Sequence, residues 1–176
     1  MSPPPARYAT VSTPPGPFTV VVTDDHRQEV VLASGWTDDV SELLPVVHRT
    51  LRPTWVERAD SLEALAAVAA FADGDLAAVD DVPVRQRSGP FLTDAWEVLR
   101  TVPAGSPDTY AEFAARCGHP TAVRAAAAAC ARNAAALFVP CHRVLATGGG
   151  LGGFRWGTPV KRWLLDHEAE HAPAPV

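Results

Sequence analysis

The stretch TYAEFAARCGHPTAVRAAAAACARN, residues 109–133, carries two short helical patterns on either side of a glycine-containing turn. Thr109 and Glu112 have the spacing of a capping box, in which both side chains satisfy backbone N–H groups at the start of a helix. Gly118 stands where a helix commonly ends. The second pattern, residues 121–133, follows almost at once. Two helices joined in this way predict a helix-turn-helix, which is common in DNA-binding proteins but also occurs without DNA.

The second of these helices is almost entirely alanine. Its exceptions include Arg124 and Arg132. An alanine face is typical of a helix that packs tightly against its neighbours. It also suits a surface without bulk that can approach a nucleic-acid groove while Arg124 projects from it. Composition alone leaves both interpretations open and favours the first.

Charge divides the chain into unlike halves, although the formal net charge is −5. Residues 1–90 hold seven arginines against thirteen acids, or −6, whereas residues 91–176 hold eight basic residues against seven acids, or +1. From Phe113 to Leu165 there is no acid, but there are seven basic residues: Arg116, Arg124, Arg132, Arg143, Arg155, Lys161 and Arg162. Such a stretch indicates either a binding face for a polyanion or a solvated basic surface.

The first half has the pattern of a small sheet with a helix. Residues 18–24 and 29–36 are β-branched runs separated by DHRQ, which predicts a hairpin. Residues 61–74 have helical periodicity, with Ser61 as the expected N-cap and Gly74 as the stop.

The predicted fold class is α+β, with a small N-terminal sheet-plus-helix domain and a mainly helical C-terminal domain that contains a winged-helix-like helix-turn-helix. The C-terminal helices start with an amphipathic pattern at residues 93–102, after a linker predicted at residues 82–91. The expected division is a flexible proline-rich N-terminus, an N-terminal α/β domain, a C-terminal domain and a flexible tail, at residues 1–17, 18–86, 90–168 and 169–176.

Three cysteines, Cys117, Cys130 and Cys141, are odd in number and lack C-x-x-C spacing, which disfavours a disulfide framework or a zinc knuckle. The N-terminus has no apolar core of a signal peptide, and no apolar run reaches the length of a membrane span. We therefore expect a cytoplasmic protein without membrane contact.

Cys141 has the surroundings of a nucleophile. Pro140 suits the first position of a helix or tight turn, where free backbone N–H groups would lower the pKa of the next thiol. His142 is adjacent in sequence, so its ring is expected to reach the thiol through a water molecule. A helix predicted from Thr158 as N-cap and Pro159 as first residue ends with two acids, Asp166 and Glu168, either of which could orient the imidazole. The alternative is a buried cysteine beside a surface histidine, while Cys117 and Cys130, placed within helices, are expected to stay protonated and unreactive.

The hexapeptide VPCHRV, residues 139–144, resembles the active-site sequence of the O6-alkylguanine-DNA alkyltransferases. The resemblance extends over residues 91–168. It includes, in order, Tyr110, Arg124, Asn133, PCHR at 140–143, GGGLGGFRWG at 148–157 and LLDHE ending at Glu168. It departs where the family has tyrosine and this chain has Phe154, where RAAA replaces RAVG after Arg124, and where Ala134 follows Asn133 in place of proline.

The resemblance implies repair of double-stranded DNA that contains O6-alkylguanine, with O4-alkylthymine as a further candidate substrate. Cys141 would take the alkyl group once, assisted by His142, Glu168 and Asn133, in a monomer that needs no cofactor. The helix-turn-helix would bind the minor groove and Arg124 would replace the extruded base. The implied DNA-binding residues are Tyr110, Thr121, Arg124, Ala125 and Arg132, and the implied pocket residues are Val144, Gly150, Phe154, Arg155 and Trp156.

Two rival functions and one metal question accompany this interpretation. One rival is a DNA-binding regulator that senses alkylation, and the other is a cytosolic thiol hydrolase acting on a small substrate. The acid-free basic stretch and Arg124 disfavour the hydrolase. Zinc-containing relatives take their ligands from the N-terminal domain, and residues 1–90 hold no cysteine, so no metal is expected.

Overall fold

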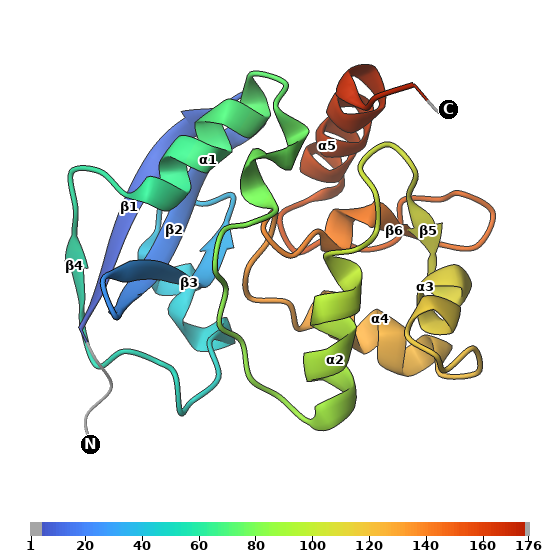
Figure 1. Ribbon diagram of the computed structural model, residues 1–176, viewed down its shortest axis with the longest axis horizontal. Coiled ribbons are helices and arrows are strands. Elements are labelled where there is room, and N and C mark those ends of the chain that lie inside the picture. The colour runs from blue at the N-terminus through green and yellow to red at the C-terminus, as the bar shows by residue number, and fades with distance from the viewer. Residues whose placement is uncertain (1–4, 175–176) are drawn as a thin grey trace.

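A four-stranded sheet forms one side of the molecule and a group of helices forms the other (Figure 1). The computed structural model describes residues 5–174. The strand order is β3-β2-β1-β4, in which β4 is parallel to β1 and the other neighbours are antiparallel. The strands are β1 (Ala6–Thr13), β2 (Gly16–Asp25), β3 (Gln28–Gly35) and β4 (Val56–Arg58).

Both faces of this sheet are covered, and β2 is therefore buried without alternation from residue 18 to residue 23. One face packs against α1 (Glu63–Ala72), where Phe18 and Val20 join a core with Phe71. The other face packs against a segment with two short 3-10 helices, η1 (Val40–Glu42) and η2 (Leu44–Val46). The apolar runs that predicted the strands thus reflect burial on two sides.

The predicted hairpin is confirmed. Asp25 pairs with Gln28, and the two residues between them, His26 and Arg27, have φ of 48° and 72°. Two consecutive left-handed residues match the twist of the flanking strands in a two-residue hairpin loop.

The expectation of a flexible segment at residues 1–17 is wrong for residues 6–13, which form β1 in the middle of the sheet. Residues 1–4 lie outside the described part of the chain. Prolines flank this strand and do not interrupt it, since Pro14 and Pro15 occupy the turn between Thr13 and Gly16. Their density gave the segment the composition of a linker.

The start of α1 also differs from the prediction. Its N-cap position is Leu62, without a side-chain cap, and Ser61 lies outside the helix. The backbone N–H of Ala64 donates instead to Oε2 of Glu29 on β3, at 3.1 Å. A carboxylate from a neighbouring strand replaces the local cap and favours the positive end of the helix. Gly74 has φ of 107° just past the helix, as expected for a stop.

The helical part contains α2 (Pro90–Leu99), α3 (Tyr110–Arg116), α4 (Val123–Ala131) and α5 (Thr158–His171). It also contains two short parallel strands, β5 (Asp108–Thr109) and β6 (Val144–Leu145), and two 3-10 turns, η3 (Leu76–Val79) and η4 (Cys141–Arg143). The capping box of Thr109 and Glu112 is present at the start of α3. The α+β class is confirmed, while the winged-helix detail stays a prediction.

Several helix ends differ from those predicted. Helix α2 begins three residues early because Pro90 occupies its first position, a residue that the sequence analysis assigned to the linker. Helix α4 is two residues shorter at each end than residues 121–133. Helix α5 has Gly157 at its N-cap position and extends to His171, so the tail predicted from residue 169 begins later.

Strand β3 joins the two parts of the molecule. Val31 forms a parallel bridge with Val84, and Ser34 forms one with Ala135, so the connecting segment and the helical part both pair with the same edge strand. One apolar core runs through both parts and includes Phe18, Trp96, Phe138 and Leu164. The predicted linker at residues 82–91 is therefore partly built into the structure, at residues 83–85 against β3.

Candidate active site

Cys141 opens the 3-10 turn η4 and lies at a cavity of about 340 Å³. Its side chain is buried, with 9% exposed. The other lining residues come from α3, from α4 and the residues after it, and from the glycine-rich loop: Tyr110, Ala127, Cys130, Ala131, Asn133, Ala136, Gly153, Phe154, Arg155 and Trp156. Helix α4, the second helix of the helix-turn-helix, therefore forms one wall of the space in front of the thiol.

His142 and Glu168 form a fully buried pair behind Cys141. Nε2 of His142 lies 2.6 Å from Oε1 of Glu168. The pairing resolves the choice between the two acids of α5, because Asp166 is exposed and lies 3.8 Å from Arg162 instead. A carboxylate only accepts hydrogen bonds, so Nε2 carries the proton and Nδ1 has a free lone pair. Within residues 5–174, this buried Nδ1 has no hydrogen-bond partner.

Arg143 holds the same carboxylate from another side. Its Nε donates to both oxygens of Glu168, at 3.0 and 3.1 Å, and its Nη2 donates to Oε1 at 2.9 Å. Burial opposes ionisation of Glu168, but the interaction with His142 and the charge and hydrogen bonds of Arg143 outweigh it and lower the pKa of the carboxyl to about 2. Glu168 is therefore ionised at neutral pH. Burial lowers the pKa of His142, more than the pull of Glu168 raises it, which keeps the imidazole neutral at rest.

The expected lowering of the Cys141 pKa is wrong. Burial raises the pKa of the thiol, and the opposing effects of a hydrogen bond from Asn133 and of the charges on Lys161 and Arg155 are smaller. A three-residue 3-10 turn offers few free N–H groups, and complete desolvation outweighs them. Cys141 is a thiol at rest, so the reaction needs a base. Burial also raises the pKa of Cys117 and of Cys130, in line with the expected inertness of both.

Asn133 braces the segment that leads to Cys141. Its Nδ2 donates to the carbonyl of Val139 at 2.7 Å, and its Oδ1 accepts from the backbone of Ala135 and from Gln86. Both the nitrogen and the oxygen of the Asn133 amide therefore form hydrogen bonds. The bond from Gln86 links Asn133 to the connecting segment.

The sequence analysis missed two buried cations of the site, Arg143 and Lys161. Nζ of Lys161 donates to the carbonyl of Val144 at 2.8 Å, and its ammonium lies 6.0 Å from the ring centre of Phe154. Lys161 and Glu168 are seven residues apart on α5, which places both on its buried face with Leu164. That spacing is the signal in the sequence by which Lys161 could have been found.

Other predicted site residues separate into those at the cavity and those away from it. Phe154, Arg155 and Trp156, predicted as pocket residues, line it, and so does Tyr110, which was predicted to bind DNA. Gly150 is exposed and does not line the cavity, whereas Gly153 of the same loop does. Val144 is fully buried in β6 and does not line the cavity either. The remaining predicted DNA-binding residues lie on α4 or next to its two ends: Thr121, Arg124 and Arg132 are exposed, and Ala125 is partly buried.

The thiol of Cys141 thus lies next to a helix-turn-helix, a motif that is common in DNA-binding proteins. The comparisons with known proteins agree with this arrangement. Residues 90–170 match the family described as 6-O-methylguanine DNA methyltransferase, DNA binding domain. The methylated-DNA–protein-cysteine methyltransferase of Salmonella typhimurium is 32% identical over 158 residues, which cover 90% of this chain and 92% of that protein. The chain belongs to the methylated-DNA–protein-cysteine methyltransferase family.

Solved structures support the same assignment. The crystal structure of Mycobacterium tuberculosis O6-methylguanine methyltransferase superposes with a TM-score of 0.75 at 30% identity, covering 97% of this chain and 96% of that one. Mycobacterium tuberculosis OGT in complex with DNA gives a TM-score of 0.71 at 29% identity, with 96% of each chain covered. None of the helices that the structure describes is long and apolar enough to cross a membrane.

Proposed function

We propose that this protein repairs double-stranded DNA by transferring the alkyl group of O6-alkylguanine to Cys141, in a single turnover. The observation that carries the proposal is the buried thiol at the end of a cavity walled by α4, with the His142–Glu168 pair behind it. Family membership supplies the substrate class. The proposal includes a monomer that acts in the cytoplasm without a cofactor, with O4-alkylthymine as a second substrate.

Proton transfer follows from the order of the groups. Nδ1 of His142 accepts the thiol proton through a water molecule, and the ionised Glu168 stabilises the imidazolium that forms. The Cys141 sulfur then attacks the alkyl carbon, a C–S bond forms and the C–O6 bond breaks. The electron pair leaves with O6, and the guanine takes up one proton as it departs. The thioether has no leaving group that a base could activate, so the protein stays modified.

The DNA contacts follow from the exposed side of the helix-turn-helix. Arg124 projects from α4 among alanines, in a position to fill the stack when guanine leaves it. We expect Thr121 and Ala125, close to Arg124 in sequence, and Arg132, at the end of α4, to contact the DNA as well. Tyr110 lines the cavity, and we expect it to lie near the phosphate of the turned-out nucleotide. Asn133 positions Cys141, and Phe154, Arg155 and Trp156 close around the base.

A duplex that contains one O6-methylguanine tests the proposal. Incubation should raise the mass of the protein by one methyl group at Cys141 and restore guanine in the strand, while Cys141→Ser should do neither. A strand that keeps its O6-methylguanine, with an unmodified protein, would contradict the proposal. Continued conversion of substrate beyond one equivalent would favour the hydrolase.

A further inference from the structure

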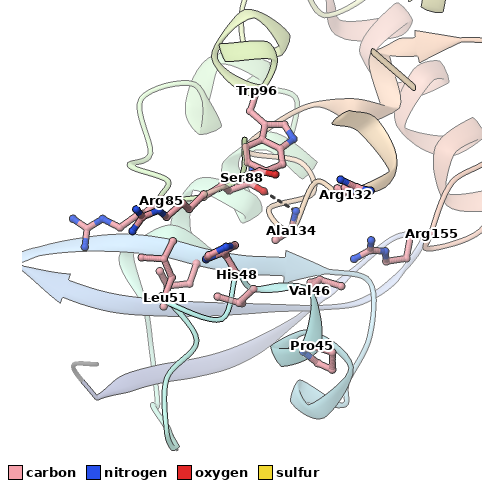
Figure 2. A pocket seen from close by; sticks show the side chains of 14 residues that line it. Pro45, Val46, His48, Leu51, Arg85, Ser88, Trp96, Arg132, Ala134 and Arg155 are labelled. Carbon is pink, nitrogen blue, oxygen red and sulfur yellow. Dashed lines mark hydrogen bonds between the residues drawn. The ribbon is translucent and has the colours of Figure 1, made fainter. Parts of the chain in front are cut away.

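A second cavity, of about 300 Å³, lies where the sheet meets the helical part (Figure 2). It is lined from β3, from η2 and the residues after it, from the connecting segment at residues 85–88, from α2, from the residues that follow α4, and from the glycine-rich loop. Four arginines and one histidine take part: Arg85, Arg87, Arg132, Arg155 and His48. None of the described residues that line it is an aspartate or a glutamate. We refer to this cavity as the arginine pocket.

Most of its positive charge is unpaired. Arg85 forms an ion pair with Asp25. Arg87, Arg132 and Arg155 have no carboxylate within 4.0 Å in the part of the chain that the structure describes. Arg155 is exposed, and its Nη2 donates to the carbonyl of Ala131 at 2.6 Å. Like charges gathered in one cavity repel one another, and an anion would relieve that repulsion.

The arginine pocket adjoins the cavity at Cys141, which we call the reaction cavity. Arg155 lines both, and Figure 2 shows Arg132 and Arg155 together on one side of the arginine pocket, with His48 from the sheet domain opposite. Arg132 follows Arg124 by eight residues, a separation of about 12 Å along a helix axis. One DNA strand rises about 3.4 Å per nucleotide, so three to four nucleotides cover that distance.

We propose that the arginine pocket binds a backbone phosphate of the damaged strand, about three to four nucleotides from the base that Arg124 replaces. This inference rests on the proposed function. Guanidinium groups match phosphate oxygens in pairs, and four arginines line the pocket. The sheet domain and the connecting segment, although their half of the chain is acidic overall, thereby contribute His48 and Arg87 to the DNA-binding surface.

Removing one of these charges tests the proposal. Arg87→Gln keeps most of the side chain and lies on the connecting segment, away from Cys141. The matched control is Arg58→Gln, on β4 at the outer edge of the sheet (Figure 1). The side chain of Arg58 is exposed. The affinity of each protein for an unmodified duplex is measured over a range of salt concentrations.

Loss of one phosphate contact makes the slope of log affinity against log salt less steep by about 0.9. We expect that change for Arg87→Gln and none for Arg58→Gln. Both variants should react with free O6-benzylguanine as fast as the wild-type protein does, because the free base has no phosphate.

Neutral methylphosphonate linkages locate the phosphate. Placed singly along the damaged strand, one linkage about three to four nucleotides from the lesion should weaken binding of the wild-type protein, but not weaken binding of Arg87→Gln any further. A wild-type slope in Arg87→Gln, or additive effects at every linkage, would overturn the proposal. Pyrophosphate binding that depends on Arg87, with an unchanged duplex slope, would overturn it too and indicate a site for small anions. Failure of the proposed function is distinguishable, since the wild-type protein would then not react with the free base.

Discussion

Nε2 of His142 lies 2.6 Å from a carboxylate oxygen of Glu168, and Arg143 donates to both oxygens of the same carboxylate. The ionised carboxylate of Glu168 therefore fixes the tautomer of His142 and also neutralises the charge of the buried Arg143 guanidinium. The side chains of His142 and Glu168 are each 1% exposed, so the arrangement is shielded from solvent. We therefore expect catalysis and stability to depend on the same three residues.

Glu168→Gln should lower both stability and rate. The substitution leaves the Arg143 charge buried without a counter-ion, which we expect to lower the free energy of unfolding by about 3–5 kcal/mol. It also removes the charge that stabilises the imidazolium, which should slow benzyl transfer to Cys141 by about 10²-fold or more. Urea unfolding measures the loss of stability, and mass spectrometry of samples quenched at successive times measures the rate of benzyl transfer. Asp166→Asn, at the exposed acid two residues earlier, should change neither; equal effects of both substitutions would contradict the role of Glu168.

Stability should fall as the pH drops through two ranges. Burial lowers the folded pKa of His142, so below its unfolded pKa of 6.5 the unfolded chain takes up a proton that the folded protein excludes. Glu168 contributes stability above its unfolded pKa of 4.5, and that contribution is lost as the pH falls toward its folded pKa of about 2. Each excluded or released proton changes the free energy of unfolding by at most about 1.4 kcal/mol per pH unit.

Urea unfolding between pH 7.5 and pH 5 measures the first range. His142→Gln should flatten the dependence below pH 6.5, whereas His26→Asn, at a fully exposed histidine of the β2–β3 turn, should leave it unchanged. An unaltered slope in His142→Gln would show that His142 is not excluded from protonation in the folded state.

Arg124→Ala should separate DNA binding from chemistry. A helix accepts alanine at this exposed position, so the thermal unfolding midpoint should stay near that of the wild-type protein. Repair of a methylated duplex should become much slower, while the reaction with free O6-benzylguanine should keep its rate. Equal slowing of both reactions would count against a role for Arg124 in replacing the extruded base.

Gly35→Ala should narrow the reaction cavity from behind. A Cβ atom at Gly35 on β3 would lie 2.0 Å from the ring of Trp156, whose indole forms part of the cavity wall. Backbone does not yield easily, so the ring should move toward the cavity. We expect a loss of about 1–3 kcal/mol in the free energy of unfolding and slower transfer of benzyl than of methyl, relative to the wild-type protein. Adding Trp156→Leu should restore benzyl transfer; an equal effect on both alkyl groups would place the indole outside the path of the substrate.

The sequence predicted those features that depend on local spacing. The capping box at Thr109, the β2–β3 hairpin and the order of motifs around Cys141 required no distant contact. The helical period of α5 also contained the information that Glu168, and not Asp166, pairs with His142. Glu168 shares a helix face with Leu164, which is buried, and Asp166 shares one with Arg162, which is exposed.

Long-range contacts account for what the sequence did not predict. The cap of α1 comes from Glu29, on a strand 35 residues away. The direction of the Cys141 pKa shift depends on burial by segments from across the chain, which no local pattern reveals. The arginine pocket likewise unites residues that lie far apart in the sequence, from Leu32 to Arg155.

The most direct measurement of the central claim is the stoichiometry of benzyl uptake from excess O6-benzylguanine, by intact-mass spectrometry with peptide mapping. We predict one benzyl group per chain, at Cys141, and one guanine released, after which no more guanine appears. Cys130 lines the same cavity as Cys141 and serves as an internal control. Burial raises the pKa of its thiol as well, but the residue next to it is Ala131 and not a histidine. Since Phe154 and Trp156 narrow the cavity, a protein that stays unmodified is tested again with a methylated oligonucleotide. Guanine release beyond one equivalent, an adduct at Cys130 or Cys117, or an unmodified mass with both substrates would contradict the account.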